Sequence, residues 1–262
     1  MIDIHHHLLY GIDDGPGDIE SSLAQAQAAI ADGITHIACT PHANEMYDFS
    51  PERNAERLSA IRDRVGDKLT LGLGCDFHLS QENISDALSN PTKYTINQGR
   101  YLLVEFAEYM IPRDIDHSFY ELTLRGIRPI ITHPERNPIL QRDPSRLPEW
   151  MRIGCLVQVT AASLGEGFGR KAQAVVWEML ERDWVHFIAT DAHNLNGRRP
   201  CLSEAYQAVS KRMGHFTADR LCIDNPRAAF NNADLGPQPT PEGMDEDAPL
   251  KRKGFFSRVF GR

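Results

Sequence analysis

The feature that most constrains the fold is a regular alternation of short apolar runs with longer amphipathic stretches along the first 230 residues. Short apolar runs have the length of buried strands, and the stretches between them have helical composition. Buried strands that alternate with helices are typical of a parallel sheet with helices on its outside. The predicted strands are 1–4, 34–40, 69–74, 101–106, 127–132, 156–159 and 185–190. The predicted helices are 18–32, 51–65, 114–125, 144–153, 170–182, 203–213 and 224–232.

The number of units favours a closed barrel over an open sheet. About seven strand–helix units fit into some 230 residues, which is the scale of a parallel α/β barrel. In such a barrel the carboxyl ends of all strands open on one face, where these folds build their sites. The sequence therefore predicts an α/β fold, a TIM-like (β/α)7 barrel in a single domain.

The character of the sequence changes near residue 232. The segment DLGPQPTPEGMDEDAP is rich in proline, glycine and acid, which is typical of a flexible linker. It leads to KRKGFFSRVFGR at 251–262, which is basic and contains three phenylalanines. We predict one domain over 1–232 and a flexible tail over 233–262. The simpler interpretation of the tail is a solvated segment, and the alternative is weak contact with an anionic membrane surface or a partner.

Charge and residue usage narrow the class of protein. The chain has 28 Lys and Arg against 36 Asp and Glu, a net charge of −8, which argues against nucleic acid as a partner. No apolar run approaches membrane-spanning length, and the N-terminus lacks the pattern of a secretory signal, so we expect a cytoplasmic protein. The five cysteines show no C-x-x-C pair and are expected to be reduced.

Side chains of metal-ligand type follow six of the predicted strands. Each is weak evidence alone; the triplet His5–His7, for instance, resembles an ordinary surface run. However, alternate residues of an extended strand face the same side, so His5 and His7 can reach one ion. Carboxyl ends of parallel strands share one rim, so the side chains should meet there. The candidates are His5, His7, His42, Asp76, Glu105, His133, Asp191 and His193, with an acid from the loop after the first strand, Asp13 or Asp14, that can lean over the same rim.

The candidate ligands also indicate which metals would bind. Imidazoles mixed with carboxylates, without a thiolate pair, favour Mn, Zn or Fe over Ca. Nine candidates are too many for one ion. Two ions bridged by a carboxylate and a hydroxide suit hydrolysis of a phosphate ester, and a third ion could be accommodated.

At these residues the sequence resembles the polymerase and histidinol phosphatase (PHP) superfamily. Within it, the sequence is most similar to the bacterial manganese-dependent protein-tyrosine phosphatases of capsular and exopolysaccharide synthesis. The matching stretches span residues 1 to about 230 in order. They are MIDIHHHLLYGIDDGP, ITHIACTPH, YLLVEF, PIITHPERN and HFIATDAHNLNGRRP.

The resemblance implies a distorted (β/α)7 barrel, the PHP fold, with two or three ions, Mn²⁺ foremost and Fe or Zn as alternatives. Eight of the nine candidates match motif residues of the family, and of the two loop acids the motif selects Asp14. Asp76 departs from the family pattern, which usually has glutamate there, and its side chain is one methylene shorter. His78, nearby, is interpreted as a bystander.

Two arginines complete the predicted site. Arg136 lies three residues after His133, and Arg198 follows the loop that contains His193. A guanidinium group matches a phosphoryl group geometrically, whereas surface salt bridges are the plainer interpretation of both residues. The resemblance implies phosphate binding by Arg136 and Arg198, and favours Arg198 over Arg199. The glycine-rich segment 163–169 is expected to be a plain turn rather than an anion cradle.

These residues predict direct hydrolysis of phosphotyrosine by metal-activated hydroxide, with the arginines neutralising phosphoryl oxygens. A cysteinyl-phosphate route is not supported, because no cysteine is followed six positions later by arginine. An acid on the rim, such as Asp13, could assist departure of the phenolate. The resemblance implies that the substrate is a phosphotyrosyl protein, a cognate tyrosine autokinase that controls polysaccharide chain length.

Two alternatives stay open at this point. One is another PHP phosphoesterase, such as a histidinol-phosphate phosphatase or a nuclease. The other is a non-catalytic regulator that uses the barrel only to dock a kinase. The sequence does not indicate whether the chain forms homo-oligomers.

Overall fold

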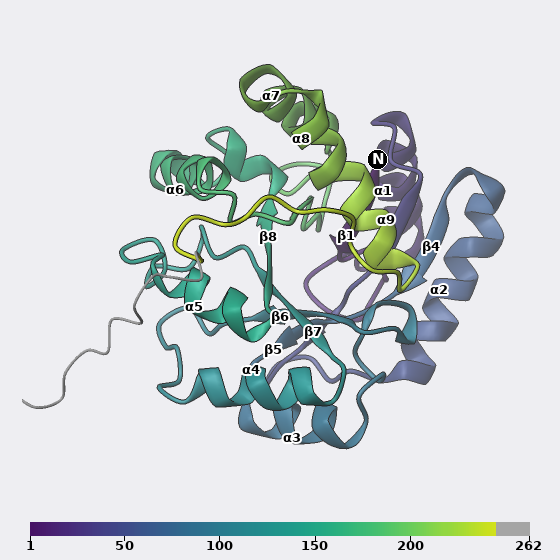
Figure 1. Cartoon of the computed structure of the whole chain (residues 1–262). Helices are drawn as coiled ribbons and strands as arrows, with labels where there is room; N and C mark the ends of the chain where they lie inside the picture. Colours follow the sequence, from purple (N-terminus) through teal and green to yellow (C-terminus); the bar gives the residue numbers. More distant parts are fainter. Residues whose placement is uncertain (245–262) are drawn as a thin grey trace, which may run out of the picture.

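The structure is a computed structural model that describes residues 1–244; the predicted basic segment 251–262 lies outside the described residues. Parallel strands form its centre and helices surround them (Figure 1). The strands are β1 (Ile2–His6), β2 (His36–Cys39), β3 (His42–Ala43), β4 (Thr70–Leu73), β5 (Asp76–His78), β6 (Tyr101–Glu105), β7 (Arg128–Thr132), β8 (Leu156–Thr160) and β9 (Phe187–Ala189). The helices are α1 (Ile19–Ala31), α2 (Pro51–Val65), α3 (Gln81–Ser89), α4 (Ile115–Leu124), α5 (Arg146–Ile153), α6 (Gly169–Glu181), α7 (Ser203–Met213), α8 (His215–Asp219) and α9 (Asn225–Phe230).

The nine strand segments amount to seven barrel strands, because two strands are interrupted. All pairings are parallel, in the orders β1-β2-β4 and β3-β5-β6-β7-β8-β9. The gap between β2 and β3 contains Pro41, which has no N–H to donate. Pairing continues across the gap, since the carbonyl of Pro41 accepts a hydrogen bond from the N–H of Asp76 at 3.1 Å. We therefore treat β2–β3 and β4–β5 as two continuous strands.

The barrel closes between its first and last strands. Asp191 N–H donates to the carbonyl of His5 at 2.8 Å, and His7 N–H donates to the carbonyl of Ala192 at 2.9 Å. A parallel bridge between His6 and Ala192 completes the closure. The predicted seven-stranded α/β barrel is confirmed, and the strands and helices expected from the sequence appear within a few residues of their predicted bounds.

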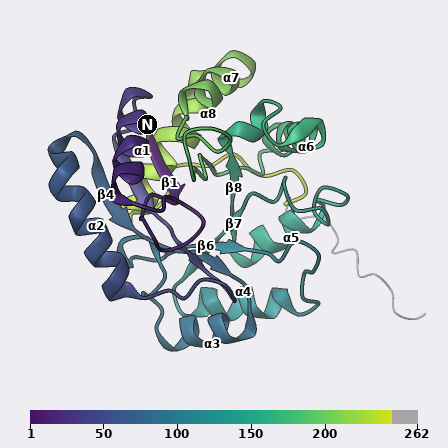
Figure 2. The same cartoon turned by 180° about the vertical axis from the view of Figure 1, so that it is seen from behind.

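Two helices were not predicted: α3, which lies after the third predicted strand, and the short α8. Helix α3 is capped by Ser80, whose side chain accepts a hydrogen bond from Asn83 N–H at 3.1 Å. Of the apolar side chains of α3, only Ala87 is fully buried, while Ile84 and Leu88 are partly buried. Figure 2 shows α3 beside α4 on the outside of the barrel.

Apolar side chains pack in two layers, one inside the barrel and one between the strands and the helices. The outer layer is the larger and contains Trp150, Phe119 and Val176. The inner layer is closed at the amino ends of the strands by Phe230 of α9. Its strand residues are Ile2, Ile4, Ala38, Tyr101, Leu103, Ile130, Leu156, Phe187 and Ala189.

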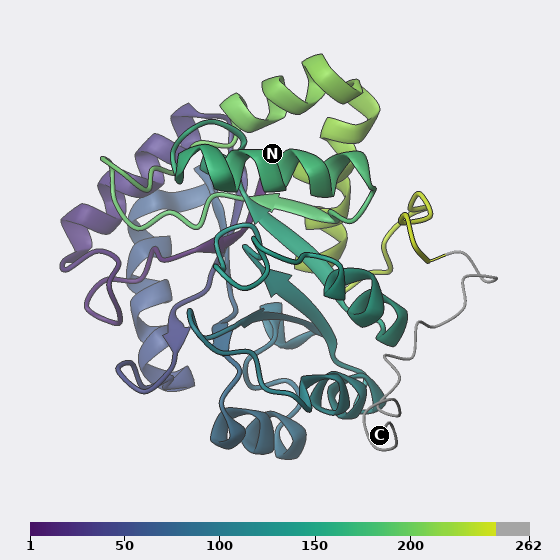
Figure 3. The ribbon, with the colours of Figure 1, turned by 90° about the vertical axis from the view of Figure 1, so that its left-hand side faces the viewer.

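The segment 233–244 runs from α9 across the amino ends of the strands to α5 (Figure 3). The Tyr101 hydroxyl donates to the carbonyl of Ala233 at 2.6 Å, and Trp184 Nε1–H donates to the carbonyl of Glu242 at 2.9 Å. Arg100 forms an ion pair with Asp234 at 2.8 Å. This part of the predicted linker thus has specific contacts with the barrel, and a domain boundary after residue 232 stays a prediction. None of the helices in the described part of the chain is long and apolar enough to cross a membrane.

Candidate metal centre

The candidate ligands occupy the inward-facing positions just beyond the apolar interior. Inward-facing residues of a strand are two positions apart. Leu103 in the interior is therefore followed by Glu105 at the mouth, and Ala189 is followed by Asp191. In β1 a register shift between Asp3 and His6 changes this alternation, so that Ile4 packs in the interior while His5 faces the mouth.

The structure brings all nine predicted ligands together. Their ligand atoms form four overlapping groups, and within each group these atoms lie within 4.8 Å of one another. His5, His7, His42 and Asp76 each belong to two groups, which joins the four into one cluster. Among residues 1–244 the groups contain no other residue. The groups are His7–Asp14–His42–His193, His5–His7–Asp76, His5–His133–Asp191 and His42–Asp76–Glu105.

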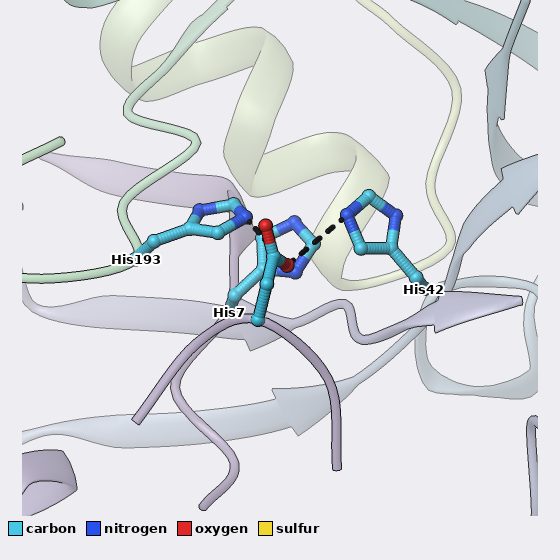
Figure 4. Close-up of side chains that lie close together, drawn as sticks. His7, His42 and His193 are labelled. Atoms are coloured by element: carbon cyan, nitrogen blue, oxygen red, sulfur yellow. Dashed lines mark ion pairs between the residues drawn. The ribbon is translucent and has the colours of Figure 1, made fainter. Parts of the chain in front are cut away.

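Asp14 approaches the cluster from the loop after β1. Its Oδ1 lies 3.4 Å from His42 Nε2 and 3.2 Å from His193 Nε2. Figure 4 shows His42 and His193 on either side of this carboxylate, with His7 between them. The Asp14 side chain is 44% exposed, so this edge of the cluster is open to solvent.

Asp76, the residue that departs from the family pattern, lies at the buried centre. Its Oδ2 is 3.4 Å from His5 Nε2 and 3.3 Å from His42 Nδ1. The shorter aspartate side chain therefore still reaches two candidate ligands. Burial raises the pKa of this carboxyl group, but His5 and His42 outweigh it and hold the pKa well below its usual range.

Asp191 connects the cluster to both predicted arginines. Its Oδ1 lies 3.2 Å from His5 Nε2 and 3.4 Å from His7 Nε2. Its Oδ2 accepts hydrogen bonds from Arg136 and, at 2.5 Å, from Arg198. Two guanidinium groups from different loops thus converge on one anionic oxygen, which is the arrangement that a phosphoryl group requires.

Each guanidinium group has a distinct setting. Arg136 stacks on the ring of Phe168, 4.3 Å from the ring centroid, and Phe168 comes from the glycine-rich segment 163–169. Arg198 is also 3.8 Å from Asp14 Oδ2. Arg199 instead pairs with Glu204 at 3.5 Å, so of these two arginines it is Arg198 that contacts the cluster, through Asp14 and Asp191.

Imidazoles and carboxylates lie close together in the cluster, and this proximity shifts their pKa values. Burial would lower the pKa of His5, but the carboxylates of Asp191 and Asp76 outweigh it and raise the pKa to about 9. Burial would also lower the pKa of His42, but the nearby carboxylates of Asp14 and Asp76 outweigh it and raise the pKa to about 11. Since metal binding requires neutral imidazole, cations entering this site would release protons.

The donor set fits divalent cations. Both oxygens of Asp76, Oδ1 of Asp191 and Nε2 of His193 are buried and lack hydrogen-bond partners within the described residues. Buried polar atoms without partners are costly, and several converging on one space indicate that a cation is their partner. Mixed imidazole and carboxylate donors are those that Mn, Zn and Fe accept.

The backbone is strained at the ends of two strands, at His133 after β7 and at Asp191 after β9. His133 has φ 33° and Asp191 has φ 52°, values in the left-handed region that residues other than glycine rarely adopt. Such conformations persist only where surrounding contacts hold them, and they are concentrated at functional sites. Here they turn both side chains into the mouth.

Asp13, considered as a general acid, does not face the cluster. Its Oδ2 accepts hydrogen bonds from His7 Nδ1 at 2.7 Å and from His42 N–H at 3.1 Å, and its Oδ1 accepts from Gly15 N–H at 3.0 Å. Burial is outweighed by His7, so the pKa of Asp13 is lowered. Asp13 therefore orients His7, with Nε2 toward the cluster, and has no proton to donate near neutral pH.

Gln158 is a functional residue that sequence reasoning missed. Its Oε1 accepts a hydrogen bond from His5 Nδ1 at 2.9 Å, which leaves Nε2 of His5 free to bind metal. Its backbone carbonyl accepts from His133 N–H at 2.8 Å. The one feature of the sequence that could have indicated this role is that Gln158 is a polar residue inside the apolar run LVQV.

A Gln158→Leu variant is expected to bind divalent metal about 10- to 100-fold more weakly, because His5 loses the acceptor that fixes its tautomer. Gln158→Glu, which keeps an acceptor oxygen, should retain most of the affinity. Calorimetric titration with metal measures this, and circular dichroism checks that both variants are folded. Equal affinity in the wild type and Gln158→Leu would show that Gln158 has no such role.

Comparison with known proteins relates the chain to a family of capsular polysaccharide synthesis proteins and to tyrosine-protein phosphatases. Residues 1–231 match the family model described as capsular polysaccharide synthesis, CpsB/CapC. The chain is 32% identical to tyrosine-protein phosphatase CpsB of Streptococcus pneumoniae, over 87% of this chain and 97% of that protein. It is also 32% identical to tyrosine-protein phosphatase YwqE of Bacillus subtilis, over 98% of this chain and 99% of that protein.

A solved structure agrees with these matches. It comes from the crystal structures of YwqE from Bacillus subtilis and CpsB from Streptococcus pneumoniae, two proteins described as unique metal-dependent tyrosine phosphatases. It superposes with a TM-score of 0.85 at 32% identity, covering 92% of this chain and 99% of that one. Both the fold and the whole length of the barrel are therefore shared.

Proposed function

The chain belongs to the CpsB/CapC family of capsular polysaccharide synthesis proteins, and from that premise we propose that it is a metal-dependent protein-tyrosine phosphatase. The observation that carries the proposal is the position of Asp191. One of its oxygens faces the histidine cluster and the other accepts hydrogen bonds from two arginines. A site that joins cation ligands to two guanidinium groups is suited to a phosphate ester.

Two or three divalent ions would be held by the nine residues of the four groups, and we propose Mn²⁺, with Fe or Zn as alternatives. Bound ions supply Lewis-acid charge and lower the pKa of water so that hydroxide is available at neutral pH. Four overlapping groups that share His5, His7, His42 and Asp76 support more than one ion.

The chain's own residues bind and orient the substrate. Arg136 and Arg198 hold phosphoryl oxygens through charge-assisted hydrogen bonds and stabilise charge that develops during transfer. Phe168 restrains the Arg136 guanidinium from one side. The leaving phenolate has a pKa near 10, so strong proton donation to it is less necessary than for an alkyl ester.

We further propose that the substrate is a phosphotyrosyl protein, a cognate tyrosine autokinase of capsular or exopolysaccharide synthesis in the cytoplasm. The family to which the chain belongs supports this choice. The half-exposed Asp14 at the outer edge of the cluster supports a macromolecular substrate, because it leaves the mouth open on that side.

A substrate panel tests the proposal. With Mn²⁺ added, the purified protein should release phosphate from a phosphotyrosyl peptide, and much less from histidinol phosphate or single-stranded DNA. Chelation should abolish the release, and returning Mn²⁺ should restore it. Full activity after chelation would refute the metal requirement. Faster turnover of histidinol phosphate or DNA would favour another phosphoesterase, and kinase binding without any turnover would favour the docking regulator.

A further inference from the structure

A groove lies beside the metal centre, between α3 and α4. It encloses about 610 Å³, and the two helices that form its walls lie side by side (Figures 1 and 2). The lining mixes apolar and polar side chains. The apolar lining includes Leu79, Ile84, Leu88, Phe106 and Ile115.

The groove adjoins the metal centre along β5 and β6. Phe106, which lines the groove, directly follows the candidate ligand Glu105, and His78 pairs with Glu105 in the β5–β6 ladder. Leu79 N–H donates to the carbonyl of Glu105 at 3.0 Å. Consecutive Cα atoms are about 3.8 Å apart, so a substrate chain with phosphotyrosine at the centre needs only a few residues to reach the groove.

Exposed apolar side chains flank the groove. Met110, which lines it, is 63% exposed, and the neighbouring Tyr109 is 78% exposed. Met46 is also 78% exposed and follows Glu45, another lining residue. Large apolar side chains gathered at one place on a surface indicate a site for a binding partner.

The polar part of the lining is acidic. Glu45, Asp114 and Glu121 contribute carboxylates, and the lining residues include no lysine or arginine. Glu121 is paired only loosely, at 3.6 Å from the exposed His117. An occupant that complements this surface in charge carries lysine or arginine next to its apolar side chain.

We propose that the α3–α4 groove binds the part of the substrate protein next to phosphotyrosine, and that it selects a large apolar side chain flanked by basic residues. This inference rests on the proposed phosphatase function. It makes the groove a determinant of substrate choice, separate from the phosphoryl chemistry at the metal centre.

Three phosphotyrosyl peptides test the selection, together with free phosphotyrosine. The first carries leucine and lysine within a few residues of phosphotyrosine, the second has serine in place of leucine, and the third has glutamate in place of lysine. We expect kcat/KM for the first to exceed the other two by about tenfold, a difference of about 1.4 kcal/mol. Equal kcat/KM values for the three peptides, with free phosphotyrosine still hydrolysed, would overturn this inference and leave the proposed phosphatase function intact.

A double variant, Glu45→Lys with Glu121→Lys, checks where the selection arises. It should reverse the preference between the lysine and glutamate peptides, measured as the ratio of their kcat/KM values. The matched control is Glu149→Lys on α5, an exposed glutamate outside the groove, which should keep the wild-type preference. Absence of hydrolysis for free phosphotyrosine and all peptides in the metal-loaded wild type would instead refute the proposed function.

The chain's own basic segment 251–262 is the competing occupant. Because this segment is basic and contains three phenylalanines, a synthetic peptide of its sequence should inhibit the wild type more than the double variant. If the groove serves the substrate, this inhibition should accompany unequal turnover of the three substrate peptides. Inhibition that is confined to the wild type, together with equal turnover of the three substrate peptides, would assign the groove to that segment and overturn the inference.

Discussion

An Asp191→Asn variant is expected to lose at least about 10³-fold in phosphotyrosyl hydrolysis. One carboxylate has two roles here, since Oδ1 faces His5 and His7 while Oδ2 accepts hydrogen bonds from two arginines. An amide keeps the size of the side chain but removes its negative charge. Metal binding and the orientation of both guanidinium groups should therefore weaken together.

Steady-state kinetics with excess Mn²⁺, combined with metal analysis of the purified variant, measure both effects. The control is Asp3→Asn, which replaces a buried carboxylate in the same region. Asp3 accepts hydrogen bonds from Thr190 N–H and the Thr190 hydroxyl and has no place in the four ligand groups. We expect Asp3→Asn to keep most of the activity. If the two variants were equally active, Asp191 would have no special role at the centre.

The sequence was enough to predict the barrel and eight of the nine clustered residues, for one physical reason. The ninth, Asp14, lies in a loop, and its choice over Asp13 rests on the resemblance to the family. Parallel strands present their carboxyl ends on one face, so a polar residue at the end of each apolar run can be assigned to a shared rim without further information. Glu105 after Leu103 and Asp191 after Ala189 both follow this rule. The rule did not require knowledge of how strands separated in sequence pack against one another.

What the sequence could not show depends on packing between distant segments. Gln158 contacts His5 across 153 positions, and nothing near Gln158 in the sequence indicates that contact. Helix α3 was missed because it is short and only three of its nine residues are apolar. The role of Asp13 was also hidden, since a carboxylate that orients a histidine and one that donates a proton look the same in sequence.

The second large effect is expected from the arginines. Arg136→Ala and Arg198→Ala should each lower kcat/KM for phosphotyrosyl peptide by about 10²- to 10³-fold, because each removes a donor to phosphoryl oxygens. The double variant should lose less than the product of the two single effects. Both guanidinium groups contact the same Asp191 oxygen, so removing one leaves the other less well oriented.

Measurements that separate phosphate binding from metal binding decide this prediction. Inhibition by inorganic phosphate should weaken in both variants, while bound metal stays near the wild-type amount, because neither arginine is a candidate ligand. Arg199→Ala is the matched control, since Arg199 is 54% exposed and paired with Glu204 outside the cluster. Its kcat/KM should stay close to that of the wild type. Loss of metal from the Arg136 and Arg198 variants would mean that these residues support the ion cluster, and their assignment to phosphate binding would then be wrong.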